Sequence, residues 1–228
     1  MRAAPRHSEA RDRFTPNPAL LDPRFARLVG REAWARLPEA VRRRFGHRVE
    51  PGQTAVYAGR IRHTRMNGLG RVLAQLLRPF GQPFPLDACE GGPAAVVAIT
   101  EGVNGAEQFW TRQYGRPQAG RRRFPQVVHS AKVFGGPTGC EEWTGPLGVA
   151  HAVTEDGGDL VFRSRAFRVQ LGPVRLTLPR FLHPGALEVR HRDRGADGFT
   201  FTLTLIHPIF GTLLDQVIDF HDLSEVLP

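Results

Sequence analysis

The stretch Phe199-Thr200-Phe201-Thr202-Leu203-Thr204-Leu205-Ile206-His207 decides the fold. Large apolar side chains alternate with threonines along it, which is typical of a strand that buries one face and carries β-branched residues on the other. Continuing the alternation places His207 on the apolar side, so we expect its imidazole to point inward at the mouth of the sheet. An imidazole in that position is either a general acid or base or a core histidine with satisfied hydrogen bonds.

Similar short segments recur through the rest of the chain, and turn signals such as Asn104-Gly105 and Asp156-Gly157-Gly158 separate them. A first strand is predicted at Thr54–Arg65. The later candidates are Phe84–Glu90, Ala94–Glu101, Glu107–Tyr114, Arg122–Phe134, Leu147–Thr154, Leu160–Val169, Leu187–His191, Phe199–His207 and Thr212–Phe220. An antiparallel sheet of this length curls to remove its edges. We therefore expect an α+β fold built on a half-open, lipocalin-like barrel of about eight or nine strands.

Helical periodicity is confined to two regions outside this sheet. Residues 23–46 predict two helices at the N-terminal side, and Leu69–Leu77 predicts a third helix that flanks the barrel. Residues 1–18 hold little that can be buried and are expected to form a disordered arm. Residues 19–228 then form a single β-rich domain.

The charge balance does not by itself identify a partner. The 228 residues include 31 Lys and Arg against 22 Asp and Glu, a net charge of +9, yet Lys132 is the single lysine. The arginines are scattered and lack interleaved aromatics, so we expect a solvated basic face and no nucleic-acid partner, with anionic ligands or membrane surfaces as open alternatives. No apolar run approaches the ~20 residues of a transmembrane segment, and the start lacks a secretory signal. A cytoplasmic protein with free thiols at Cys89 and Cys140 is expected.

Motifs for metals and cofactors are missing from the sequence. Gly68-Leu69-Gly70 opens a helix after a strand, but the third glycine of a dinucleotide loop would fall on Leu73. The histidines are dispersed, with no pair at metal-ligand spacing. We therefore expect no metal and no cofactor.

The strand Glu107–Tyr114 carries the strongest candidate ligand-binding residues. Trp110, Arg112 and Tyr114 share one face and offer a cation, hydrogen-bond donors and π surfaces. Such a wall suits a partly apolar ligand with a carboxylate, carbonyl or phosphate, although an exterior cation–π ladder would show the same pattern. Arg180 lies in an apolar, proline-bracketed segment, residues 176–182, that is either a lid over a pocket or a strand crossing.

Two carboxylates and the lone lysine complete the candidate groups. Glu142 precedes a turn, and burial would raise its pKa if it pointed inward. Glu188 has the opposite parity to its apolar neighbours, which favours an outward position, but we include it with His207 and Glu142 as a candidate catalytic group. Lys132 is a Schiff-base candidate unless it faces solvent.

Several of these pieces, taken in order, resemble a known family. They are residues 37–46, Trp110-x-Arg112-x-Tyr114-Gly115, Glu142-x-x-Gly145-Pro146-Leu147, residues 178–182, Ala186-x-Glu188 and His207-Pro208-x-x-Gly211. The chain is similar to an uncharacterised bacterial domain-of-unknown-function family, whose members occur alone or fused behind a saccharopine-dehydrogenase-like NAD(P)-binding domain. The resemblance covers about residue 24 onward. It implies a bacterial cytoplasmic protein with a reductase-like partner and carries over no catalytic residues.

Two functions are consistent with this pattern. The first is a binding domain for a hydrophobic small molecule with a polar or anionic head, such as a lipid or polyketide-like compound, serving a reductase partner. The alternative is a metal-independent isomerase, cyclase or decarboxylase that acts by acid–base chemistry on a carbonyl compound inside the barrel. A third class is an accessory protein that docks on a reductase through its arginine-rich helices.

Overall fold

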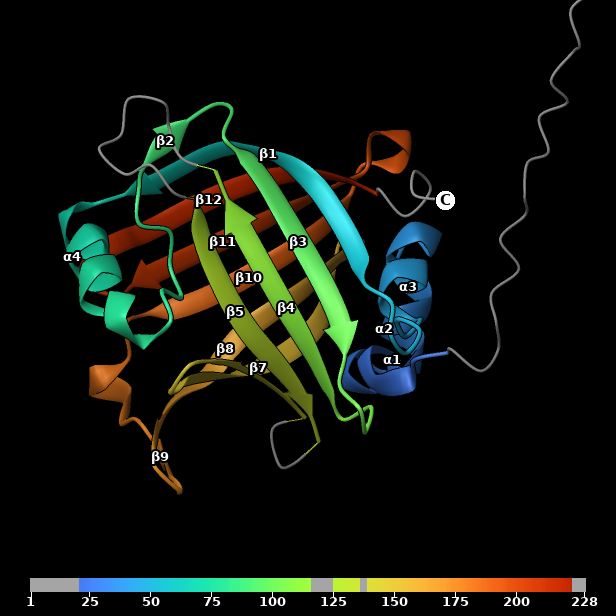
Figure 1. Cartoon of the computed structure of the whole chain (residues 1–228), viewed down its shortest axis with the longest axis horizontal. Helices are drawn as coiled ribbons and strands as arrows, with labels where there is room; N and C mark the ends of the chain where they lie inside the picture. The colour runs from blue at the N-terminus through green and yellow to red at the C-terminus, as the bar shows by residue number, and fades with distance from the viewer. Residues whose placement is uncertain (1–20, 116–124, 136–138, 223–228) are drawn as a thin grey trace, which may run out of the picture.

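The computed structural model describes residues 21–115, 125–135 and 139–222. The arm predicted at residues 1–18 lies outside the described residues. Within them, ten antiparallel strands form one closed barrel (Figure 1). In barrel order the ten strands are β10 (Ala186–Asp193), β11 (Phe199–His207), β12 (Gly211–Asp222), β1 (Ala55–Met66), β3 (Ala94–Glu101), β4 (Glu107–Tyr114), β5 (Gln126–Phe134), β6 (Cys140–Thr144), β7 (Leu147–Asp156) and β8 (Asp159–Leu171).

Pairing between β8 and β10 closes the barrel. The register runs from Glu188 opposite Arg163 to His191 opposite Leu160. The prediction of a half-open barrel with about eight or nine strands was therefore wrong in both respects, because the sheet has no free edge at this position and the described residues supply ten strands. The α+β class and the antiparallel, curled sheet are confirmed.

Strand boundaries follow the alternation that the sequence carries. On β3 the side chains of Ala95, Val97 and Ile99 are buried and alternate with more exposed neighbours. Three of the predicted strands, β3, β4 and β11, have the bounds expected from the sequence. The strand predicted at Arg122–Phe134 corresponds to β5, which begins at Gln126. Residues 116–124 lie outside the described residues.

Two short strands lie outside the ten-strand barrel, and one predicted strand forms only in part. β2 (Cys89–Glu90) pairs with β1, and β9 (Val174–Thr177) pairs with β8. Phe84–Glu90 was predicted as a strand, but only its last two residues are one. The amide of Gln126 replaces the missing ladder: its Oε1 accepts from the backbone of Leu86 and its Nε2 donates to the carbonyl of Phe84, at 3.0 Å and 2.8 Å.

Three helices, α1 (Pro23–Val29), α2 (Arg31–Arg36) and α3 (Glu39–Phe45), cover one end of the barrel (Figure 1). The sequence predicted two helices over residues 23–46. The extra break lies at Gly30, which adopts φ +89°, a conformation that ends one helix and starts the next. Phe25 packs edge-on against Phe45 and Phe134, so these helices close the barrel with an aromatic plug.

The helix predicted to flank the barrel is present at the opposite end as α4 (Gly68–Leu76). Asn67 caps it by accepting a hydrogen bond from the backbone of Gly70. Gly70 is required there, because a Cβ atom would lie 1.9 Å from the carbonyl oxygen of Leu213 on β12. The short 3₁₀ turns η2 (Arg78–Phe80) and η3 (Arg180–Leu182) lie beyond the strands, whereas η4 (Gly195–Asp197) connects β10 to β11. None of the described helices is long and apolar enough to cross a membrane.

Candidate functional site

The barrel encloses a cavity of about 270 Å³ that opens between α4 and η3. Its volume is close to the lower end of the range for small-molecule sites. Most of its lining is apolar and comes from the inward positions of the strands, from α4 and from the segments beside the mouth. These residues include Leu73, Leu77, Phe84, Val97, Phe162, Phe167, Leu178, Leu187, Leu203, Ile218 and Phe220.

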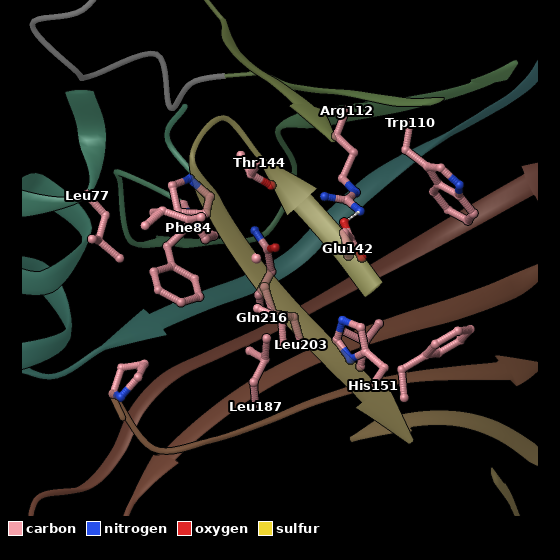
Figure 2. Close-up of a pocket in the computed structure, with 18 of the residues that line it drawn as sticks. Leu77, Phe84, Trp110, Arg112, Glu142, Thr144, His151, Leu187, Leu203 and Gln216 are labelled. Carbon is pink, nitrogen blue, oxygen red and sulfur yellow. Dashed lines mark hydrogen bonds and ion pairs between the residues drawn. The ribbon is translucent and has the colours of Figure 1, made fainter. Parts of the chain in front are cut away.

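A charged cluster interrupts this apolar lining in the middle of the barrel (Figure 2). Arg112 on β4, Lys132 on β5 and Glu142 on β6 come from three adjacent strands. The carboxylate of Glu142 accepts hydrogen bonds from the guanidinium of Arg112, from the ammonium of Lys132 and from the hydroxyl of Ser130, the last at 2.8 Å. We call Arg112, Lys132 and Glu142 the cavity triad.

The cavity triad carries one more positive than negative charge. Burial acts to raise the pKa of Glu142, but Arg112 and Lys132 outweigh it and hold this pKa well below its usual value. The prediction that burial would raise the pKa of an inward Glu142 was therefore wrong, because it omitted the two cations. Lys132 also lies 4.6 Å from the ring centroid of Trp110, so the excess positive charge rests against an aromatic surface.

His151 on β7 lines the cavity beside the triad (Figure 2). Its side chain is buried, and burial lowers its pKa to about 4 although Glu142 acts in the opposite direction. The imidazole is therefore neutral near pH 7. Among the described residues, none forms a hydrogen bond with its Nδ1 atom. A buried polar atom without a partner is uncommon in folded proteins and points to a missing ligand or water.

Four of the predicted site residues lie around this cavity. Trp110, Arg112 and Tyr114 line it together from β4, and Glu142 lines it from β6. The neighbouring Glu141 does not line it; its carboxylate accepts hydrogen bonds from Arg168 and from the Trp143 indole. The inward alternation of β4 was thus enough to identify one wall of the cavity.

His207 and Arg180 do not reach the cavity. A register shift between Leu205 and Ile206 breaks the alternation that predicted an inward His207. Its Nδ1 instead accepts a hydrogen bond from the backbone of Ile209 at 3.2 Å in the β11–β12 turn. Arg180 lies exposed on η3, where Leu182 of the same turn lines the mouth. The segment at residues 176–182 therefore includes part of β9 and part of the mouth.

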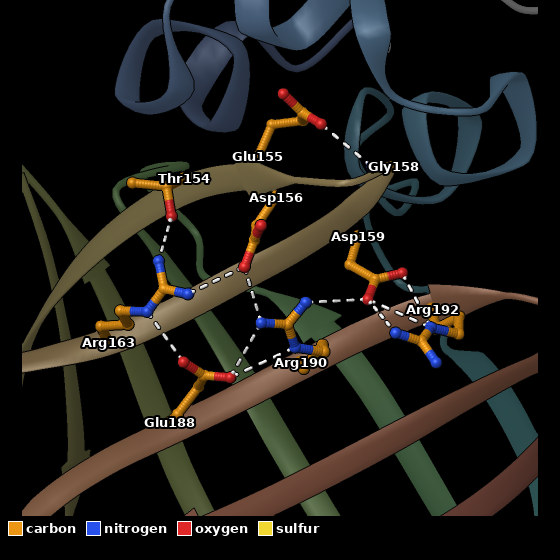
Figure 3. Close-up of polar contacts among 9 residues, drawn as sticks. All are labelled: Thr154, Glu155, Asp156, Gly158, Asp159, Arg163, Glu188, Arg190 and Arg192. Atoms are coloured by element: carbon orange, nitrogen blue, oxygen red, sulfur yellow. Dashed lines mark hydrogen bonds and ion pairs between the residues drawn. The ribbon is translucent and has the colours of Figure 1, made fainter.

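Glu188, a candidate catalytic group, faces the outside of the barrel, as its parity favoured, and does not line the cavity (Figure 3). Its carboxylate pairs with Arg163 and Arg190 at 2.8 Å and 3.2 Å. Asp156 and Asp159 extend the same network over the β8–β10 seam. These ion pairs join the strands that close the barrel and take no part in the cavity.

Two functional candidates in the cavity were weakly signalled by the sequence. Lys132, for which the sequence leaves a Schiff-base role and a solvent-facing position open, lines the cavity with 5% of its surface exposed. His151 also lines the cavity, and sequence reasoning missed it. It shares the parity of Val149 and Val153 on β7, which is the signal that would have placed it inward. No group of three metal-ligating side chains occurs within residues 21–115, 125–135 and 139–222.

The comparisons with known proteins identify the family but no activity. No curated protein and no solved structure matches the chain. A family model described as "Domain of unknown function (DUF4166)" matches residues 37–220, a range that contains the cavity triad and His151. The chain therefore belongs to the DUF4166 family.

Proposed function

We propose that this domain binds a hydrophobic small molecule with a polar or anionic head inside the barrel. The single observation that carries the proposal is the cavity triad, which leaves one buried cation in excess within an otherwise apolar chamber. A buried charge without full compensation is costly, and an anionic head would neutralise it. Arg112 and Lys132 are then the head-group ligands.

The position of the triad relative to the mouth sets the orientation of the ligand. Leu77, Phe84 and Leu187 lie between the triad and the open end (Figure 2). An apolar tail would contact these side chains, while the partnerless Nδ1 of His151 adds a polar contact for the head. A volume of about 270 Å³ favours a compact ligand or one whose tail extends into the mouth.

Native mass spectrometry of the freshly purified protein is the first test. We expect a retained small molecule with 1:1 stoichiometry, released by organic solvent and identified by its accurate mass. Anilinonaphthalene sulfonate, an apolar fluorophore with an anionic head, provides a defined probe. Its Kd is expected to rise about tenfold in Lys132→Met, since one charge-assisted contact of about 1.5 kcal/mol is lost.

Arg163→Met supplies the matched control, because Arg163 lies on the outer face of the same barrel. This variant removes an equal charge and should leave the Kd of the probe unchanged. A protein that retains no molecule, and whose probe binding responds equally to both substitutions, would contradict a head-group site at the triad.

The resemblance to chains fused behind saccharopine-dehydrogenase-like domains supports a cytoplasmic reductase as the protein that receives the ligand. Purification of the tagged domain from a bacterial host that encodes it tests this partner. We expect a reductase of that type to elute with the wild-type domain, and its absence from the eluate would count against the pairing.

A second function, acid–base catalysis on a carbonyl compound, is favoured by the neutral imidazole of His151 beside two cations. His151 would take a proton from the carbon next to the carbonyl and return it, while Arg112 and Lys132 stabilise the enolate oxygen. Phenylpyruvate in D₂O tests this chemistry: the methylene protons should exchange in the wild type and not in His151→Asn, with His207→Asn as the control. Borohydride reduction with the same keto acid tests a Schiff base at Lys132.

A further inference from the structure

Exposed apolar side chains gather at the open end of the barrel. Three segments meet there: residues 67–86 with α4 and η2, residues 171–187 with β9 and η3, and residues 206–214 with the β11–β12 turn. The register holds them together, because Ala186 pairs with Ile206 across β10 and β11, and the Asn67 amide donates to the carbonyl of Phe210 at 3.1 Å. We call these three segments the mouth rim.

Part of the apolar side chains of the mouth rim pack in the core of the barrel, and the others project into solvent. Phe181 is 83% exposed and Ile209 is 80% exposed. Leu76, Phe80, Leu182 and Phe210 are also exposed large apolar residues. Exposed apolar side chains that surround an opening mark an interaction surface.

Charge on the mouth rim has one sign. None of the 22 acidic residues of the chain lies in these three segments, whereas they contain Arg71, Arg78, Arg175 and Arg180. Among the described residues, no acidic side chain forms an ion pair with Arg71, Arg78 or Arg180. The opposite end of the barrel is different, because acidic residues lie among the basic ones there and some helix arginines pair with acids, as Arg24 does with Glu101.

We propose that the mouth rim docks onto an anionic lipid bilayer. Phe181, Ile209 and Leu76 would enter the boundary between head groups and acyl chains, and the four arginines would contact lipid phosphates. A second copy of this chain fits less well, since a symmetric contact would place arginines against arginines with no acid between them. The basic surface is complementary to lipid phosphates.

Docking at this end would bring the cavity mouth against the bilayer. Leu77 and Leu182 line both the mouth and the cavity, so an apolar molecule would pass between membrane and barrel without crossing water. This exchange rests on the proposed function, whereas docking depends on the mouth rim alone. Lys132→Met, which removes a cavity charge, should weaken probe binding and leave docking unchanged.

Flotation with vesicles tests the proposal. We expect the full chain to float with phosphatidylcholine vesicles that contain about one-third phosphatidylglycerol, and to remain unbound with phosphatidylcholine alone. Arg78→Ala with Arg180→Ala should lower the partition coefficient by about 20- to 30-fold. Phe181→Ser with Ile209→Ser should lower it by about tenfold or more, since two exposed apolar side chains lose their membrane contact.

Matched controls lie at the opposite end of the barrel. Val103→Ser replaces a fully exposed apolar residue in the β3–β4 turn, and Arg42→Ala with Arg43→Ala removes two exposed charges from α3. These variants should bind vesicles as the wild type does. All the replaced side chains are exposed, and circular dichroism checks that each variant is folded.

Three results would overturn the proposal. The first is equal loss of flotation in the control and mouth-rim variants, which would indicate adsorption by net charge. The second is equal binding to vesicles with and without phosphatidylglycerol. The third is no flotation together with a dimer, seen by analytical ultracentrifugation, that the mouth-rim variants convert to monomer; a second copy would then cover this surface.

Discussion

Lowering the pH from about 7.5 to about 5 should destabilise this barrel through two buried histidines. His191 is 1% exposed and stacks on Phe199 with ring centroids 4.7 Å apart. Within the described part of the chain, neither of its ring nitrogens has a hydrogen-bond partner. Burial, aided by Arg44, lowers the pKa of His191 to about 3, and burial lowers that of His151 to about 4.

The magnitude follows from the difference between folded and unfolded pKa values. In the unfolded chain both imidazoles have their ordinary pKa of 6.5. Below that pH the unfolded state therefore binds more protons than the folded state. Stability is therefore intact above pH 6.5 and is lost as the pH falls toward about 4 and about 3. At about pH 5 each histidine removes about 2 kcal/mol from the free energy of unfolding, or about 4 kcal/mol together.

Glu142 affects stability at a lower pH than the two histidines do. The depressed pKa of Glu142 favours the folded state above the carboxyl's ordinary value of 4.5, and this contribution is lost only as the pH falls below that value. A decrease in the free energy of unfolding between about pH 6.5 and about pH 5 therefore reports on His151 and His191.

Urea unfolding followed by circular dichroism across this pH range measures the effect. His191→Phe should remove about half of the pH dependence, since a phenyl ring takes up no proton, while Val103→Ser, which changes no titratable group, should retain all of it. A free energy of unfolding that stays constant between about pH 7.5 and about pH 5, or a His191→Phe variant with the full wild-type slope, would refute the reasoning.

Three further substitutions test the cavity, the seam and α4 by the same urea assay. Glu142→Gln leaves two buried cations without their carboxylate and should lower the free energy of unfolding by about 3–5 kcal/mol. An unchanged urea midpoint would contradict a buried charge cluster. Arg190→Ala should cost about 1 kcal/mol in low salt and less in high salt, so a salt-independent loss would argue against an ion-pair role. Gly70→Ala should destabilise by about 1–3 kcal/mol, because its Cβ would meet the Leu213 carbonyl, whereas Gly68→Ala has open space and should not.

Alternation predicted the barrel wherever one face of a strand is apolar. It identified β11 and β4 with their bounds, because every second side chain there is buried against the core or the cavity. It missed β6, whose residues Cys140–Thr144 are nearly all buried on both faces and so show no alternation. Closure depends on the long-range pairing of β8 with β10, a contact that no local pattern encodes.

The position of a site residue was predictable where side chains alternate regularly along a strand. It was not predictable where a β-bulge or an ion pair with another strand intervenes. Trp110 and Arg112 were placed inward correctly because β4 has no irregularity in its described register. His207 was misplaced by the register shift after Leu205. The low pKa of Glu142 depends on Arg112 and Lys132 from two other strands, and no local sequence pattern pairs these residues with Glu142.

The position of β12 in the barrel determines when the cavity can exist. β12 follows every other described strand along the chain, yet it lies between β1 and β11 and pairs with both. During translation, β1 therefore leaves the ribosome long before the strand that flanks it has been made. The chamber holding the cavity triad stays open along this gap until β12 emerges, and a chain cut before Gly211 would expose two strand edges to aggregation.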